Sequence, residues 1–257
     1  MSTEHSVIVH ADAELLAEAV AARMLVRLID AQSARGSASV VLTGGRVAAQ
    51  VYRALAAGPA VQAVDWSRVD VWWGDERFLP AGHPDRNETQ AREALLDVVG
   101  VDPARVRPMP PSDGVDGDDP EAAAARYAAV LADAASGSAE LPHFDLLLLG
   151  VGEDGHVASV FPEHPVAYEK RPVAAVRGAP KPPPTRITLT LPTLNTAEEV
   201  WLIVTGAGKA AAVGMAISGA GAVQLPAGGV EGVGRTLWLL DRAAAAQLPA
   251  SALSLRI

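Results

Sequence analysis

The 257-residue sequence contains no cysteine. Disulfide bonds, thiolate catalysis and cysteine-ligated zinc or iron–sulfur sites are therefore excluded, and nothing in the composition implies an oxidising compartment. The chain also lacks any apolar run approaching the roughly 20 residues of a membrane-spanning helix. Its first residues lack the basic and apolar segments of a secretory leader. We therefore expect a cytoplasmic protein with no membrane as partner.

Clusters of basic residues are absent as well. The chain carries 21 Lys and Arg against 30 Asp and Glu, which gives a net charge of −9. Because no basic block is present, the sequence argues against nucleic acid or an anionic membrane surface as the main partner. An anionic small molecule would need arginine or lysine side chains placed locally at its binding site.

The remaining composition, 49% hydrophobic and 20% charged, is typical of a folded globular protein. The chain is long enough to bury a sizeable core, and we predict one domain over residues 1–257. We expect this domain to be a monomer or a small homo-oligomer.

Short apolar runs alternate with helical patterns in the first hundred residues. The predicted strands are Ser6–His10, Ser39–Thr43 and Val69–Trp73. The predicted helices run from a cap at Asp12 to Ala34, over Val47–Ala57, and from Asn87 to about Val98. A polar loop, Asp75–Arg86, precedes the last helix, where Asn87 and Gln90 have the form of a capping box.

The alternation continues less regularly in the second half. After a surface loop at 110–120, Asp119 and Pro120 begin a predicted helix that ends near Ala135. Phe144–Leu149 is the most apolar run and is predicted as a central strand buried on both faces. A proline-rich segment occupies 172–184. The later predicted strands are Arg186–Leu191, Val200–Thr205 and Thr236–Leu240, and the later predicted helices are Gly208–Ser218 and Ala243–Leu248.

This order of elements predicts an α/β fold, a doubly wound and largely parallel sheet with helices on both faces. Ligands of such folds bind beyond the carboxyl ends of the strands. Four turns follow predicted strands at that edge: Thr43–Arg46, Gly74–Arg77, Gly150–His156 and Gly206–Lys209.

The turn Gly150–His156 has the glycine spacing of a dinucleotide-binding turn. That interpretation fails because Pro162 and Pro165 interrupt the long helix that the motif requires. What distinguishes the turn is Asp154 beside His156, a carboxylate able to orient an imidazole that accepts a proton near neutral pH. A structural histidine with Asp154 as a turn residue is the alternative, and position alone favours neither.

Basic residues in the other turns are candidate anchors for an anion. Lys209 stands at the start of a predicted helix, although the preceding residues do not match a Walker A loop. Gly44-Gly45-Arg46 likewise lets the backbone approach an anion at a helix N-terminus. Further charged candidates are Asp75, Arg77 and Arg186. Each of these has a solvated or ion-paired surface side chain as its alternative, and no histidine spacing suggests a metal site.

Taken together, these turns resemble the 6-phosphogluconolactonase family over nearly the whole chain. The strongest segment is the strand Phe144–Leu149, then Gly150–His156 with its Gly-x-Gly-x-Asp-Gly-His pattern, then Ala158-Ser159-Val160-Phe161-Pro162. The other matching segments are Asp75-Glu76-Arg77 with Asn87, Pro183-Pro184-Thr185-Arg186-Ile187-Thr188, and Gly206-x-x-Lys209-Ala210. The first glycine turn departs from the family's Gly-Gly-Ser-Thr-Pro, so Arg46 either substitutes for the missing hydroxyl groups or points to solvent.

The resemblance implies a fold shared with glucosamine-6-phosphate deaminases, ribose-5-phosphate isomerases and CoA transferases. It implies metal-free and cofactor-free hydrolysis of 6-phospho-D-glucono-1,5-lactone to 6-phospho-D-gluconate, a step of the oxidative pentose phosphate pathway. His156 is then the general base, with Asp154 beside it and backbone N–H groups of the glycine turns stabilising the oxyanion. The implied substrate-binding residues are Gly44, Gly45, Arg46, Asp75, Arg77, Asn87, Gly152, Arg186 and Lys209.

Two alternatives stand beside this hypothesis. A glucosamine-6-phosphate deaminase or isomerase resembles the chain in its Asp-Gly-His turn, but such enzymes tend to follow the histidine with an acidic partner that Val157–Pro162 lacks. A non-catalytic sugar-phosphate-sensing domain would carry an N-terminal helix-turn-helix and would not need His156, whereas this sequence opens on its first predicted strand. The sequence favours the lactonase over both.

Overall fold

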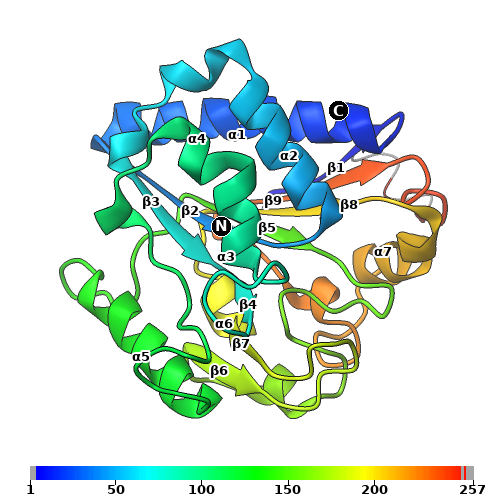
Figure 1. The fold of residues 1–257 in the computed structure, drawn as a ribbon. Coiled ribbons are helices and arrows are strands. Elements are labelled where there is room, and N and C mark those ends of the chain that lie inside the picture. Colours follow the sequence, from blue (N-terminus) through cyan, green and yellow to red (C-terminus); the bar gives the residue numbers. More distant parts are fainter. Residues whose placement is uncertain (1–3, 250–251, 253–257) are drawn as a thin grey trace.

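A six-stranded, entirely parallel sheet forms the centre of the molecule (Figure 1). The structure, a computed structural model, describes residues 4–249 and 252. The first three residues, on which the expectation of no leader partly rests, lie outside the described residues. The strands stand in the order β1-β9-β8-β5-β2-β3. Their bounds are β1 Glu4–His10, β2 Ala38–Leu42, β3 Val69–Trp73, β5 Leu146–Gly150, β8 Glu199–Val204 and β9 Arg235–Asp241.

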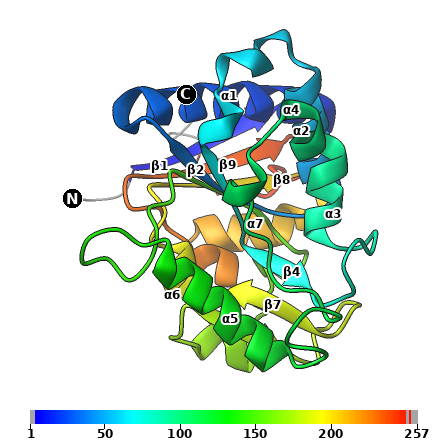
Figure 2. The ribbon, with the colours of Figure 1, turned by 60° about the vertical axis from the view of Figure 1, so that its left-hand side comes forward.

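Helices cover both faces of this sheet, as predicted (Figure 2). One face carries α1 (Ala13–Arg35), α2 (Arg46–Ala57) and a helical segment made of α3 (Asn87–Ala91), a π turn (Arg92–Leu96) and α4 (Asp97–Val99). The other side carries α6 (Leu191–Leu194) and α7 (Ala210–Ile217), while α5 (Pro120–Asp133) lies farther out and packs against the strands at 173–176 and 186–189. Short 3-10 helices occupy Pro59–Ala63, Trp66–Arg68, Pro103–Arg105, Pro165–Tyr168, Ala207–Lys209 and Pro226–Gly229. No helix within the described ranges is both long and apolar enough to cross a membrane.

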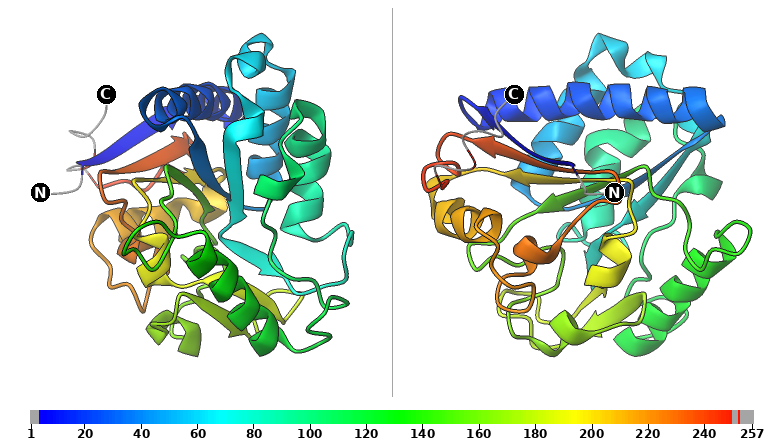
Figure 3. Two further views of the ribbon diagram at one scale, coloured as in Figure 1. Left: turned by 90° about the vertical axis from the view of Figure 1, so that its left-hand side faces the viewer. Right: turned by 180° about the vertical axis from the view of Figure 1, so that it is seen from behind.

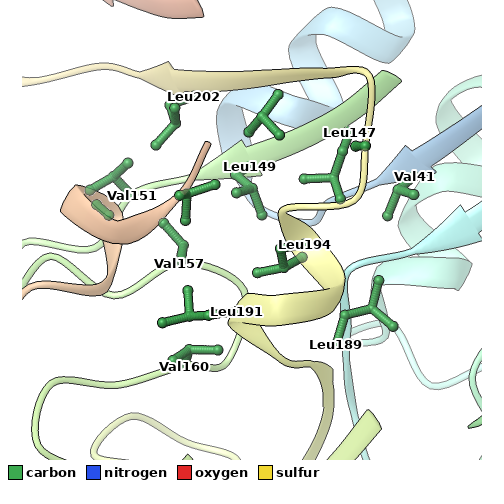
Figure 4. Close-up of a cluster of buried hydrophobic side chains, with 14 of the residues drawn as sticks. Val41, Leu147, Leu149, Val151, Val157, Val160, Leu189, Leu191, Leu194 and Leu202 are labelled. Atoms are coloured by element: carbon green, nitrogen blue, oxygen red, sulfur yellow. The ribbon is translucent and has the colours of Figure 1, made fainter. Parts of the chain in front are cut away.

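The central strand β5 explains why the sheet needs cover on both sides. Leu146 and Leu148 belong to the core that packs under α1 and α2, whereas Leu147 and Leu149 belong to the core on the opposite face. Figure 4 shows Leu147 and Leu149 facing Leu194 of α6. Each fully buried leucine contributes about 1.5–3 kcal/mol from burial of apolar surface. The apolar run in the sequence is therefore a strand buried on both faces, as predicted.

A second, smaller sheet lies below the first (Figure 3). It is antiparallel, in the order β4-β7-β6. Its strands are β4 Asp75–Arg77, β7 Arg186–Leu189 and β6 Val173–Val176. The prediction of a polar loop over Asp75–Arg86 is therefore wrong for its first three residues, which form β4. The proline-rich segment 172–184 contains β6, a strand that the sequence did not predict. Short, interrupted strands escape a periodicity argument because they contain too few residues to show one.

Two further predictions are wrong. Asn87 does not act as a capping box, because it is the first residue of α3 and Arg86 occupies the N-cap without a capping side chain. Residues 243–248 do not form a helix. They form turns after β9, in which the Asp241 carboxylate accepts the Ala244 N–H at 2.7 Å. The other predicted helices and strands fall within a few residues of the observed ones.

The strand order places a topological switch between β2 and β5. From β2 the sheet grows outward to β3, and from β5 it grows the other way to β8 and β9. The two strands pair directly at Val40 with Leu146 and Val41 with Leu147. Connections that diverge from such a point leave a crevice at the carboxyl ends of the two strands.

Candidate active site

A cavity of about 350 Å³ opens at this switch point. The four predicted turns after β2, β3, β5 and β8 converge on it. His156 lines it together with each of the predicted substrate-binding residues: Gly44, Gly45, Arg46, Asp75, Arg77, Asn87, Gly152, Arg186 and Lys209. Among the described residues, no group of three or more His, Cys, Asp or Glu side chains is placed to hold a metal ion.

Asp154 fixes the imidazole of His156 from behind. The Nδ1 atom of His156 lies 2.5 Å from Oδ1 of Asp154. Burial on its own would raise the pKa of Asp154, but the hydrogen bond and charge of His156 outweigh it and lower that pKa to about 2. Asp154 is therefore a carboxylate that accepts the Nδ1 proton, which leaves the Nε2 lone pair of His156 free.

The backbone of the turn packs tightly against this pair. The Gly152 N–H donates to the carbonyl oxygen of His156 at 2.9 Å. A Cβ atom at Gly152 would overlap both the His156 ring and the Asp154 carboxylate. The site thus requires glycine here, although the Gly152 N–H, one of the donors that the resemblance implied for an oxyanion, is already in use.

The first glycine turn offers free donors instead. In the described chain neither the Gly44 nor the Gly45 N–H has a hydrogen-bond acceptor. Gly45 is the N-cap of α2, has a φ of 101°, and supplies no side-chain cap. The positive end of a 12-residue helix and two unpaired N–H groups therefore face the cavity, an arrangement suited to an anion.

Two arginines lie side by side on neighbouring strands of the small sheet. Arg77 of β4 pairs with Arg186 of β7 in the antiparallel register, so their side chains lie on the same face. Burial lowers the pKa of Arg186, the negative charges of Asp75 and Glu76 oppose this, and the Arg77 charge lowers it further. Like charges held side by side on a cavity wall favour an anion between them.

Backbone carbonyls hold both arginines in place. Arg186 donates from Nε to the Pro183 oxygen at 3.1 Å, and from Nη2 to the Lys181 and Pro182 oxygens at 3.0 and 3.2 Å. Arg77 donates from Nη1 to the Asp85 oxygen at 2.6 Å, and its buried Nε has no partner. Arg186 therefore orders the proline-rich segment as well as facing the cavity.

Lys181, which the sequence did not single out, adds a further cation to the cavity lining. Burial lowers the pKa of Lys209, and the nearby charge of Lys181 lowers it further. Arg46 adds to the same positive field. Nothing local marks Lys181 in the sequence, because only the fold of the proline-rich segment carries it to Lys209. In a chain of net charge −9, five cationic side chains line this one cavity.

A hydrogen-bond network links the two sides of the cavity floor. Asp75, only 5% exposed, accepts the Ser159 hydroxyl at 2.6 Å and the Asn87 amide at 3.1 Å. Asn87 Oδ1 is buried without a partner and lies against Gly44, where a Cβ atom would overlap it. Ser159 was not predicted as a site residue. The sequence shows it only as a small residue, and its bond to Asp75 spans 84 positions.

The comparisons with known proteins agree with this geometry. A family model described as "Glucosamine-6-phosphate isomerases/6-phosphogluconolactonase" matches residues 11–238. The chain belongs to this family. A 6-phosphogluconolactonase of Streptomyces coelicolor is 59% identical to it over 254 residues, which are 98% of this chain and 97% of that relative. The resemblance stated from the sequence is thereby confirmed.

Solved structures of family members share the fold. The 6-phosphogluconolactonase of Trypanosoma brucei superposes with a TM-score of 0.81 at 30% identity, covering 96% of this chain and all of that one. A monomeric glucosamine-6-phosphate deaminase superposes with a TM-score of 0.77 at 20% identity, covering 94% of this chain and 99% of the other. The fold alone therefore does not separate the two activities, and the residues at the site must.

Proposed function

We propose that this chain hydrolyses 6-phospho-D-glucono-1,5-lactone to 6-phospho-D-gluconate, with His156 as the general base. The observation that carries the proposal is the Asp154–His156 pair, which stands at a cavity where cations gather. The name of the Streptomyces relative, nearly six-tenths identical over almost the whole chain, supports the same activity. We further propose that the protein works in the cytoplasm, as a monomer or small homo-oligomer.

His156 moves the proton in both halves of the reaction. Nε2 takes a proton from water as the water oxygen attacks the lactone carbonyl carbon, and the carbonyl oxygen becomes an oxyanion. When this intermediate collapses, the bond between the carbonyl carbon and the ring oxygen breaks. The imidazolium then returns the proton to the leaving ring oxygen. Asp154 stabilises the imidazolium and holds the tautomer in which Nε2 is the base.

The cations bind the phosphate and place the lactone carbonyl within reach of His156. Arg46, Arg77, Lys181, Arg186 and Lys209 line the cavity and provide counter-charge for a phosphomonoester dianion. The unpaired N–H groups of the first glycine turn also point the positive ends of their dipoles at the cavity. Binding energy from the phosphate, which does not react, is spent on orienting the reacting end of the substrate.

The deaminase alternative has less support at the site. Deaminases tend to follow the histidine with an acidic partner, and residues 157–162 contain none. Val157 and Val160 are fully buried, and Ser159 is bonded to Asp75. The side chains of this segment therefore pack in the core or bond to the cavity floor.

Lactone hydrolysis at pH 6.5–7.5 tests the proposal, with the spontaneous rate subtracted. Wild-type protein should accelerate hydrolysis greatly, and His156→Ala should lose about a hundredfold or more of kcat. Glucosamine 6-phosphate, offered in parallel, should release no ammonia. A wild-type rate equal to the spontaneous rate, or an unimpaired His156→Ala variant, would contradict the proposal.

A further inference from the structure

Glu76 sits behind the cavity wall, between two residues that line it. Side chains alternate along a strand, so Asp75 and Arg77 face the cavity while Glu76 points into the protein. It is 0% exposed, whereas buried glutamates in most proteins require a specific partner. The mechanism above gives this carboxylate no task.

The carboxylate gathers three backbone donors from two separate segments. Oε1 accepts the N–H groups of Arg77 and Asn87, both at 2.7 Å. Oε2 accepts the N–H of Glu88 at 2.9 Å. Asn87 and Glu88 begin α3, whose first-turn N–H groups have no acceptor within the helix. Glu76 therefore caps α3 from a neighbouring strand, in place of the missing side-chain cap at Arg86.

Arg86 completes the arrangement from the other side of the loop at 78–86. It is also 0% exposed, and its Nη2 lies 3.7 Å from Oε2 of Glu76. The same guanidinium donates to the backbone oxygens of Leu79 at 3.2 Å and Met109 at 2.7 Å. The loop that joins β4 to α3 is thus closed around a buried ion pair.

We propose that Glu76 is a positioning residue for substrate binding: its carboxylate fixes Arg77 and Asn87 relative to one another, and it touches no substrate itself. The inference rests on the proposed function, in which both residues bind the lactone. Asn87 in turn donates to the Asp75 backbone oxygen at 2.8 Å. A displaced α3 would therefore move Asp75, Arg77 and Asn87 together, and all three line the cavity.

Burial opposes the ionisation of Glu76. Burial raises the pKa of Glu76 to about 7, against the lowering effects of Arg86 and of the Glu88, Asn87 and Arg77 N–H groups. Because the pKa of Glu76 is raised on folding, the folded state loses stability as the pH rises from the unfolded value, near 4.5, through 7. Ionisation of Glu76 therefore does not add to the free energy of unfolding.

Asp145 provides a matched control at the opposite edge of the sheet. It is buried at 1% exposure, accepts the Ser39 N–H at 2.9 Å, and forms ion pairs with Arg27 and Arg35. It precedes β5, whereas the cavity lies beyond the carboxyl end of that strand. Neutralising Asp145 removes a buried carboxylate without touching the site.

Steady-state kinetics of Glu76→Gln, Glu76→Asp and Asp145→Asn test the inference. Glu76→Gln should raise KM about tenfold while kcat falls less than about threefold, because His156 is undisturbed. Glu76→Asp keeps the charge with a shorter reach and should lie between Glu76→Gln and wild type. Glu76→Gln should keep its Tm within about 5 °C, whereas Asp145→Asn should lower Tm and leave KM within about twofold. A wild-type KM in Glu76→Gln would overturn the inference.

Amide hydrogen exchange gives a readout that does not depend on activity. The Asn87 and Glu88 amides should exchange at least about tenfold more slowly than those of Arg46 and Val47, which begin α2 without a side-chain cap. Glu76→Gln should abolish that difference for at least one amide. A wild-type protein without lactonase activity would overturn the proposed function, whereas an active one with unprotected Asn87 and Glu88 amides would overturn only the role of Glu76.

Discussion

Two regions of the cavity differ in how far apart in the sequence their contacting residues lie. Around His156 the decisive contacts are local, since Asp154 and His156 are two positions apart and the Gly152 N–H closes the same turn. Around Asp75 they are distant, since Asn87 is 12 positions away and Ser159 is 84. The local region holds the proposed base, and the distant region holds binding groups. We therefore expect changes in the first to lower kcat and changes in the second to raise KM.

The largest effect is expected at Gly152. In Gly152→Ala the added carbon would overlap the His156 ring and the Asp154 carboxylate, so the imidazole must leave its position. We expect kcat to fall about a hundredfold or more, because small misplacements of catalytic groups are costly. Gly150→Ala is the control, since a carbon added there meets nothing within 4 Å. Equal losses in both variants would mean that crowding of the cavity, and not the imidazole, is responsible.

Asp154→Asn should have the next largest effect. An amide keeps the size of the carboxylate but removes the charge that stabilises the imidazolium and selects its tautomer. We expect kcat to fall by about 30-fold with KM nearly unchanged, measured by initial rates on the lactone. A rise in KM with normal kcat would assign Asp154 to binding and break the comparison.

In the distant region, Gly44→Ala should raise KM by about tenfold. The added carbon would overlap Asn87 Oδ1 and push the turn at Gly44 away from the start of α3, where Asn87 lies. Adding Asn87→Ala to the same chain removes the obstructing amide. The two changes should then be clearly non-additive in log KM, as expected for residues in contact. Additive effects would show that Gly44 and Asn87 act separately.

Arg186→Lys should have a smaller effect, a rise in KM of about fivefold. Lysine keeps the charge but cannot make the hydrogen bonds to the oxygens of Lys181, Pro182 and Pro183 together. The proline-rich segment should then become more susceptible to limited proteolysis. An unchanged KM and digestion pattern would mean that these bonds order nothing that binds substrate.

The smallest expected effect is that of pH on Asp154. Its pKa of about 2 lies below the unfolded value of 3.8, so its contribution is complete above pH 4 and is lost only as the pH falls through 2. The carboxyl carbon of Asp154, followed by NMR, should therefore report proton uptake only below about pH 4. Proton uptake by this carboxyl between pH 5 and 8 would contradict its role as the charge that stabilises the imidazolium.

What could be predicted from the sequence follows the same division. The strands of the large sheet and the His156 turn were predictable, because long apolar runs and local spacing specify them. The capping of α3 was not. Asn87 has the right neighbours for a capping box, but Glu76, held 11 positions upstream by the small sheet, supplies the acceptor. Lys181 and Ser159 were missed for the same reason, since their partners come from distant segments.

The most direct test compares two lactones on two variants. His156→Gln and Arg77→Lys are assayed with 6-phospho-D-glucono-1,5-lactone and with unphosphorylated D-glucono-1,5-lactone, after subtraction of spontaneous hydrolysis. The account predicts that His156→Gln loses about a hundredfold or more of kcat/KM on both lactones. Arg77→Lys should lose activity on the phosphorylated lactone alone. Equal losses of Arg77→Lys on both lactones, or retained hydrolysis by His156→Gln, would contradict it.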